Sequence, residues 1–485
     1  MSLISPSSFS TSVPSENQEQ RRRRVLVITG DPIGAKMAGP AIRAWNIAQS
    51  LADENDVTLM SLLTVEPITA PFSLVAVAPH DNDGFVQWED WADVIVFQGH
   101  AMEFFEALQK SSKILVADIY DPMHLEQLEQ AREFSREIWD SRVEIATTVL
   151  NQQLSRADFF LCASERQRLF YLGQLAALGR ITPATYEGDP DLRRLIAVVP
   201  FGLLPDFPTR DRNVLKGTLP GIGSEDKVLI WSGGVYNWFD PKTLIRAVAS
   251  LASSRPNVRL FFQGTKHPHV GVPEMAVVAE SRALAESLGV LDRSVFFNRS
   301  WVEYADRHNY LAEADAGVST HYDHIETTMS FRTRILDYLW AGLPIVATDG
   351  DVFADLIRDN RLGIVVPAQD PDALAAALDT VLYDEQFIAD TRRNIAEVRE
   401  SFYWSTVLKP LTTFVRNGRH AGDAVARIEI ARRAPVTRAA GAQPAPSSRL
   451  QTIRRAVGHL REGGPRRLAE KVVARLRHRA PDEKS

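Results

Sequence analysis

The sequence holds a single cysteine, Cys162, among its 485 residues. One cysteine excludes an intramolecular disulfide framework and any zinc site built on several thiolates. No apolar run approaches the ~18 residues that span a bilayer. The polar, serine-rich residues 1–20 lack the apolar region of a signal peptide. These absences predict a cytoplasmic protein.

Positive charge is scarce in most of the chain and concentrated at its end. The formal net charge is −6, yet residues 416–485 hold 17 basic and six acidic side chains. Residues 1–24 carry +2, so residues 25–415 carry a net charge of −19. Such an acidic body excludes a general nucleic-acid binder, and the basic end is expected to contact something anionic.

What is present is the composition of an ordinary globular protein, with 45% hydrophobic and 24% charged residues. The length favours two or three domains. In the first part of the chain, short apolar runs typical of buried parallel strands alternate with helical spacing. The strands are predicted at 24–31, 56–62, 73–78, 92–99, 113–120, 158–164 and 195–202. Helices are predicted over 39–51 and over 122–156, the latter with a break near Asp140. This alternation predicts an α/β doubly wound parallel sheet.

Residues 203–226 are rich in proline and glycine and predict an interdomain linker. A second alternating series follows. Its strands are predicted at 227–234, 258–264, 294–300, 316–321, 344–349 and 362–367, and its helices at 240–254, 273–288, 303–314, 331–341, 351–359 and 370–383. Two Rossmann-like domains would direct the carboxyl ends of their strands into one central cleft, where ligands bind in such sheets.

Four motifs lie at predicted strand ends. In the first, glycines lead into a helix start that is suited to an anion, although a plain connecting loop explains them as well. Its candidates are Gly34, Gly39, Pro40 and Arg43.

The second motif brings Asp118, Asp121 and His124 together after the strand 113–120. A carboxylate there could orient an acceptor hydroxyl or act as a base. Asp121 before Pro122 could equally be a helix N-cap, which would leave Asp118 unexplained.

The third motif is WSGGVYNWFDPK, in which Gly233 and Gly234 close a strand and allow a ligand to approach the backbone. Its aromatic residues form either a wall for a ring or ordinary loop packing. They are Tyr236, Trp238 and Phe239.

The fourth motif, residues 321–344, is the most informative. Arg332 and Arg334 stand in the first turn of a predicted helix, where cations oppose the helix dipole unless an anion binds as well. An Arg334–Asp337 pair within the helix is the structural alternative. The preceding loop holds His321, Asp323, His324 and Glu326, a weak pattern for a metal.

Together these segments resemble a known family. The GPAIR loop, FFQGTKHPH and FRTRILDYLWAGLPIVATDGD are similar to the GT-B fold retaining glycosyltransferases of family 4, also called glycosyl transferases group 1. The resemblance covers about residues 24–415 and implies two Rossmann-like domains facing a cleft. Residues 402–415 resemble the family's terminal helix, which crosses back to the first domain.

The resemblance implies a nucleotide diphosphate sugar donor, with Asp337 on the ribose hydroxyls. The family's first glutamate falls on Met329, so Glu326 is expected to supply that carboxylate, and Asp118 stands where the family has a histidine. Ser330, Phe331 and Arg332 would meet the diphosphate through their backbone.

This chain departs from the family's pattern at the residues that would bind the diphosphate. The family's arginine and lysine after the first strand of the second domain are replaced by Gly234 and Asp240. Arg332, Arg334 and Lys266 are the cations expected to compensate.

The expected activity is transfer of a sugar with retention of configuration to a glycan or lipid-linked acceptor, in cell-surface polysaccharide synthesis and without a metal or other cofactor. The missing arginine and lysine favour an alternative, a catalytically inactive GT-B protein that binds nucleotide or glycan or acts as a scaffold. A sugar-nucleotide epimerase has no supporting residue.

The predicted organisation has seven parts. They are a disordered segment (1–23), an acceptor domain (24–202), the linker (203–226), a donor domain (227–402), a cross-over helix (403–416), a second linker (417–448) and basic amphipathic helices (449–480). Residues 449–479 would bind an anionic membrane surface, on the inner face of the plasma membrane, or dock on protein. The absence of aromatic residues there argues against nucleic acid.

Overall fold

The computed structural model describes residues 22–265, 275–298 and 302–433. The chain divides into one compact unit, Met1–Val436, and a second, Thr437–Ser485, which lies outside the described residues together with the predicted basic helices. Within the described residues, no helix combines the length and the apolar character needed to cross a membrane.

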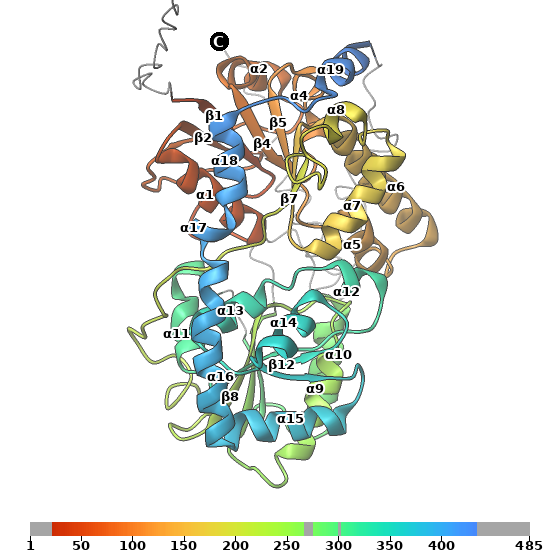
Figure 1. Cartoon of the computed structure of the whole chain (residues 1–485). Helices are drawn as coiled ribbons and strands as arrows, with labels where there is room; N and C mark the ends of the chain where they lie inside the picture. The colour runs from red at the N-terminus through yellow and green to blue at the C-terminus, as the bar shows by residue number, and fades with distance from the viewer. Residues whose placement is uncertain (1–21, 266–274, 299–301, 434–485) are drawn as a thin grey trace, which may run out of the picture. The chain divides into compact units, whose positions relative to one another are not determined.

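The first part of the larger unit, coloured red to yellow in Figure 1, contains a seven-stranded parallel sheet. The strand order is β3-β2-β1-β4-β5-β6-β7. Its strands are β1 Arg24–Thr29, β2 Asp56–Ser61, β3 Ser73–Ala76, β4 Val94–Gln98, β5 Ile114–Asp118, β6 Phe159–Cys162 and β7 Ile196–Val198. Every strand lies within a range that the sequence predicts. Val25 and Val27 enter one apolar core, whereas Leu26 and Ile28 enter another, so both faces of the sheet are covered.

The helices of this part are α1 Gly39–Ala52, α2 Asn82–Trp91, α3 Ala101–Phe104, α4 Glu106–Lys110, α5 Met123–Gln130, α6 Arg136–Arg156, α7 Glu165–Ala177 and α8 Pro183–Tyr186. The long predicted helix over 122–156 is broken before Asp140, because the Ser135 side chain caps the start of α6. Asp140 lies inside α6, where its carboxylate binds Arg136 one turn earlier at 2.8 Å.

The second part is a six-stranded sheet, again parallel, with the order β10-β9-β8-β11-β12-β13. Its strands are β8 Lys227–Gly234, β9 Val258–Gly264, β10 Val295–Phe297, β11 Ala316–Ser319, β12 Ile345–Thr348 and β13 Gly363–Val366. Its helices are α9 Pro241–Leu251, α10 Ala276–Ser287, η1 Tyr304–Asp306, α11 Arg307–Ala312, α12 Ile325–Met329, α13 Arg334–Ala341, α14 Val352–Asn360, α15 Pro371–Tyr383 and α16 Glu385–Val398. The chain order reverses at β1 and β8, the strands beside which ligands bind in open α/β sheets.

The helix predicted over 331–341 begins later, at Arg334, and the predicted loop before it contains the short helix α12. Residues 330–333 run between the two helices without helical structure. The Ser330 N–H still donates to the Glu326 carbonyl at 2.8 Å and closes α12, so only residues 331–333 lie wholly between the two helices.

The end of the described chain returns to the first sheet (Figure 1). Leu203 and Tyr403 form an isolated β-bridge. The elements of this last part of the described chain are η2 Arg399–Phe402, α17 Trp404–Val407, α18 Lys409–Asn417 and α19 Ala424–Arg433. Phe414 of α18 stacks on Phe159 with 4.2 Å between the ring centroids. The predicted cross-over is thus two helices instead of one.

The predicted linker 417–448 contains the helix α19, because Arg180 anchors Asp423 at its start. The guanidinium Nε of Arg180 lies 2.6 Å from the Asp423 carboxylate, and both side chains are buried. Composition alone does not reveal this anchor, since the two residues are far apart in the sequence.

Candidate functional site

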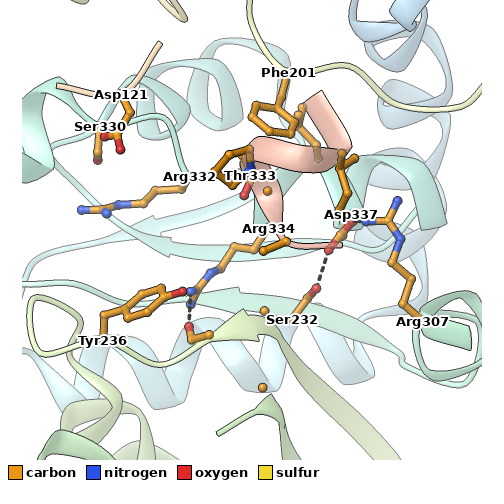
Figure 2. A pocket seen from close by; sticks show the side chains of 18 of the residues that line it. Asp121, Phe201, Ser232, Tyr236, Arg307, Ser330, Arg332, Thr333, Arg334 and Asp337 are labelled. Carbon is orange, nitrogen blue, oxygen red and sulfur yellow. Dashed lines mark hydrogen bonds and ion pairs between the residues drawn. The ribbon is translucent and has the colours of Figure 1, made fainter. Parts of the chain in front are cut away.

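A cavity of about 520 Å³ lies where the carboxyl ends of strands from both sheets meet (Figure 2). Its lining comes from the segments after β1, β5, β7, β8 and β9 and from the segment around the start of α13. Predicted site residues in the lining are Gly39, Pro40, Asp121, Gly233, Gly234, Glu326, Ser330, Arg332, Arg334 and Asp337.

Asp118 and Arg43 lie beneath this cavity and do not line it. Arg43 donates two hydrogen bonds to the Asp118 carboxylate, both at 2.7 Å, and the two side chains are fully buried. Gln98 donates a third hydrogen bond to Asp118 at 2.9 Å. Asp118 therefore does not orient an acceptor and Arg43 does not bind an anion, contrary to the prediction, because each of the two charges is compensated by the other.

The Arg43 pair supports two aromatic rings of the cavity wall. The Arg43 guanidinium lies 4.8 Å from the Tyr120 ring centroid and 5.5 Å from that of Phe201. It also donates hydrogen bonds to the backbone carbonyls of Val199 and Pro200. The pair therefore fixes the loops after β5 and β7 relative to each other.

Gly34 does not line the cavity, and it lies against a carboxylate of the chain itself. The Glu66 carboxylate accepts a hydrogen bond from the Ala35 N–H at 2.7 Å, and a Cβ atom at Gly34 would lie 2.1 Å from it. Gly34 is thus needed for close approach of Glu66, not of a ligand, whereas Gly39 and Pro40 do line the cavity.

His124 also turns away from the cavity. Its ring stacks on Phe170 with 5.6 Å between the centroids, and burial lowers its pKa below the ordinary value for histidine. Asp121, by contrast, lines the cavity together with Glu126 of α5, which the sequence analysis did not single out.

The second sheet contributes a glycine turn after β8. Gly233 adopts φ +75°, a conformation that favours glycine, and a Cβ atom at Gly264 would lie 2.5 Å from the Gly233 carbonyl oxygen. Beside this turn Tyr236 stacks on Trp238 with centroids 4.8 Å apart. The aromatic residues of this motif both pack on one another and line the cavity.

Arg334 extends from the start of α13 to the glycine turn, and its Nη2 donates a hydrogen bond to the Gly234 carbonyl at 2.6 Å (Figure 2). The guanidinium lies 4.2 Å from the ring centroids of both Trp231 and Phe239. Arg334 is only 6% exposed, and its Nη1 has no hydrogen-bond partner among the residues that the structure describes. No described carboxylate forms an ion pair with it, and burial lowers its pKa to about 10.

Arg332 leaves the same segment in another direction and is neutralised within the protein (Figure 2). Its two terminal nitrogens bind the two carboxylate oxygens of Glu326 at 2.9 and 2.6 Å. The pair lies in the cavity lining beside Ser330. The two residues that were expected to meet sugar and diphosphate separately are therefore bound to each other. The Phe331 ring packs on Phe353 in the apolar core, and the diphosphate contact predicted for its backbone stays a prediction.

Asp337 pairs with a residue that the sequence analysis missed, Arg307 of α11, at 2.9 Å. Its other carboxylate oxygen accepts a hydrogen bond from the Ser232 hydroxyl at 2.5 Å (Figure 2). The Arg334–Asp337 pair considered as an alternative is wrong, since Arg334 turns toward Gly234. Arg307 gives no local sequence signal, because its partner lies 30 residues away.

The histidines of the fourth motif have structural contacts. The ring Nε2 of buried His321 lies 3.6 Å from the Asp351 carboxylate. The His324 ring accepts a hydrogen bond from the Thr327 N–H at 3.2 Å and caps α12. Within the part of the chain that the structure describes, no three His, Cys, Asp or Glu side chains are grouped to hold a metal. Lys266 lies outside the described residues.

Comparison with known proteins fits this geometry. The family model described as Glycosyl transferases group 1 matches residues 226–384, which contain Arg334, Asp337 and the glycine turn. This segment is similar to the glycosyl transferases group 1 family and is referred to as the group 1 domain. All cavity-lining residues of the second part, from Ser232 to Trp340, lie within this segment.

Curated relatives of the group 1 domain act on inositol derivatives by name. The D-inositol 3-phosphate glycosyltransferase of Geodermatophilus obscurus is 28% identical over 230 residues, 47% of each chain. The phosphatidyl-myo-inositol mannosyltransferase of Mycolicibacterium smegmatis is 35% identical over 78 residues, 16% of this chain and 20% of that protein. The chain thus spans about half the length, or less, of the curated relatives it matches.

Solved structures extend the likeness to both sheets. Sucrose-phosphate synthase of Thermosynechococcus elongatus aligns with a TM-score of 0.57 at 15% identity, covering 82% of this chain and 99% of that one. Anabaena HepE, solved in complex with UDP-glucose, aligns with a TM-score of 0.56 at 16% identity, covering 82% and 100%. At such identities the likeness shows the fold alone, and that fold is GT-B, as the sequence predicts.

Proposed function

We propose that this protein is a retaining glycosyltransferase that moves a sugar from a nucleotide diphosphate sugar to a glycan or glycolipid acceptor. Three observations support the proposal. They are the group 1 domain, the GT-B fold and the cavity that both sheets line. Cell-surface polysaccharide synthesis is the proposed setting.

The observation that carries the proposal is Arg334. Burying a guanidinium is costly unless a carboxylate or another anion compensates it. Arg334 has no such partner among the described residues, yet its unpartnered Nη1 belongs to a side chain that lines the cavity. A bound diphosphate would supply the missing charge. Because Arg334 binds the Gly234 carbonyl, it brings a cation to the turn where the family usually has an arginine.

The chemistry follows from that position. When the glycosyl–phosphate bond breaks, negative charge grows on the departing diphosphate, and Arg334 together with the backbone N–H groups of residues 331–333 would stabilise it. Asp337, oriented by Ser232 and Arg307, would accept hydrogen bonds from the ribose hydroxyls. The acceptor would approach from the first sheet, beside Tyr120 and Asp121.

The test is release of nucleoside diphosphate by the full chain. UDP-glucose is the first donor to use, followed by GDP- and dTDP-sugars, with inositol phosphate and phosphatidylinositol as acceptors. We expect acceptor-dependent release, unchanged by EDTA, and a product whose anomeric proton coupling matches that of the donor. Inversion of the anomeric configuration would contradict retention, and loss of activity with EDTA would contradict a metal-free mechanism.

The alternative function is that of an inactive GT-B protein that binds nucleotide or glycan. The missing arginine and lysine of the family favour it, whereas the placement of Arg334 favours an enzyme. Saturable nucleotide binding in a thermal-shift assay, without release from any donor, would establish the alternative.

We further propose that residues 449–479, which lie outside the described residues, attach the protein peripherally to anionic membranes. Their basic, amphipathic sequence supports this. The full chain should co-sediment with anionic liposomes, and a chain ending at residue 433 should not. Equal sedimentation of the two would rule out the tail as the anchor.

A further inference from the structure

The first turn of helix α7 reaches from the first part of the larger unit to the group 1 domain through two neighbouring side chains, those of Arg166 and Gln167. Ser164 caps this helix, because its hydroxyl accepts a hydrogen bond from the Gln167 N–H at 3.2 Å. The cap fixes both side chains at the start of α7. Local sequence gives no signal for either residue, since their partners in the group 1 domain lie at least 162 residues away.

Gln167 uses its whole amide group to join the two sides of the cavity. Its Nε2 carries two hydrogens and donates one to the Tyr120 carbonyl at 3.0 Å and the other to the Met329 carbonyl at 2.8 Å. Its Oε1 accepts a hydrogen bond from the Ala163 N–H at 2.7 Å. The side chain is fully buried. A glutamate of the same shape has no N–H to donate, so it could not replace these contacts.

The two carbonyl groups belong to the segments that carry the proposed chemistry. Tyr120 lines the cavity and is followed by Asp121, beside which the acceptor would approach. Met329 ends α12 and is followed directly by Ser330 and by the segment up to Arg334, which would hold the diphosphate. One side chain therefore connects the acceptor side of the cavity to its donor side.

Arg166 forms a second link beside the first. Its Nη1 donates a hydrogen bond to the Gly350 carbonyl at 2.7 Å, and its Nη2 forms an ion pair with Asp355 of α14. The Arg166 and Asp355 side chains are 33% and 48% exposed, so water screens this ion pair and it is the weaker of the two links. It holds the same end of α7 against the same domain.

We propose that Gln167 is a positioning residue of the transfer reaction: its amide fixes the separation between the acceptor-binding segment after β5 and the donor-binding segment before α13. This inference rests on the proposed function. A reaction between two bound molecules depends on their relative placement, and an error of about 1 Å can cost about 100-fold in rate. Gln167 does not itself line the cavity, so it acts through the two segments that it holds.

The decisive variant is Gln167→Met in the full chain, with UDP-glucose and inositol phosphate or the other donor and acceptor that the wild type uses. Methionine is unbranched and similar in length but has no N–H, so both links to the carbonyls are lost. The residues proposed to hold the donor lie in the group 1 domain. The KM for the donor should therefore stay within about twofold, while kcat for transfer should fall between about tenfold and 100-fold.

The matched control is Gln174→Met, which removes another glutamine amide about two turns further along α7. Its transfer kinetics should match those of the wild type. A donor KM that rises in Q167M as much as kcat falls would contradict a positioning role, because Gln167 would then support donor binding instead.

The readout that a merely structural role would not move is the ratio of sugar transfer to donor hydrolysis. Water needs no placement by the first part of the unit, so hydrolysis depends mainly on the donor segment. Q167M should therefore lower transfer about tenfold more than hydrolysis, whereas a loss of folded protein would lower both alike. Arg166→Ala removes only the partly exposed link, so it should fold normally and lower the same ratio about threefold. An unchanged ratio in both variants would overturn the proposal.

A further measurement needs no activity. The single cysteine, Cys162, is fully buried, so spin labels can be attached selectively at Val86→Cys of α2 and Leu288→Cys after α10, two exposed positions. Their distance distribution reports the separation of the two sheets, and it should be broader with Q167M than without it. Identical distributions would overturn the proposal. Absence of nucleoside diphosphate release by the wild type with every donor would instead defeat the proposed function, while these distances still show whether Gln167 sets the separation.

Discussion

Arg43 and Arg334 are both buried arginines next to the cavity. Arg43 lies beneath the wall formed by the first sheet and Arg334 lies in the wall formed by the second, but among the described residues only Arg43 is paired with a carboxylate. Arg43 is fully buried against Asp118, and Arg334 is 6% exposed against two aromatic rings and one carbonyl. A buried cation with its own carboxylate holds loops in place. A buried cation without one keeps its charge available for a ligand. The contrast separates residues that build this site from those that act in it.

The largest effect should come from breaking the first pair. Replacing Arg43 by Ala leaves the Asp118 carboxylate buried and unpaired, which typically costs about 3–5 kcal/mol of unfolding free energy. Urea denaturation measures it. The double variant Arg43→Met with Asp118→Leu should recover most of the loss. If R43A alone were as stable as the wild type, the pair would not hold the loops after β5 and β7.

Replacing Arg334 by Met should instead lower activity strongly while the fold stays stable. Loss of one preorganised group that stabilises developing charge lowers kcat about 10²–10³-fold, or about 2.7–4 kcal/mol of transition-state stabilisation. The fold should become slightly more stable at neutral pH, because burial lowers the Arg334 pKa to about 10 and the charged form is thus disfavoured in the native state. Steady-state kinetics and thermal unfolding check the two halves. A variant that loses both activity and stability would place Arg334 with Arg43.

Arg332 lies between these two cases, and its replacement should lower activity less than that of Arg334. It is buried like Arg43 and paired with Glu326, but the pair lies in the cavity lining. We expect Arg332→Ala to lower both the melting temperature and kcat/KM, the latter about tenfold, equivalent to about 1.4 kcal/mol. Glu326→Gln, which keeps size and removes the charge, is its companion. A loss as large as that of R334M would make Arg332 the main diphosphate cation.

The helices and strands were predictable because each is determined by residues that are close together in the sequence. The run RVLVIT marks β1 by its buried apolar residues, and Asp240 before Pro241 marks the start of α9 by its cap. The same local reasoning located the cavity, since parallel strands end at a common edge.

The pairings within the site were not predictable in this way. Asp118 and Arg43 are 75 residues apart, and Asp337 meets Arg307 instead of its helical neighbour Arg334. Which carboxylate takes which guanidinium depends on side-chain directions set by the packing of whole elements. Asp118 and Asp121, three residues apart and alike in the sequence, therefore separate into a buried support and a cavity group.

The return of α18 to the first sheet has a consequence for synthesis. The apolar face that includes Phe159 is completed by Leu411, Phe414 and Val415, which leave the ribosome some 250 residues later. Domains usually fold as units in order of emergence. Here the N-terminal part emerges first, but its apolar face is buried last. That hydrophobic surface therefore stays exposed while the second sheet is synthesised. A chain truncated before residue 409 would keep that surface exposed permanently and should aggregate, even though every strand of the first sheet is present.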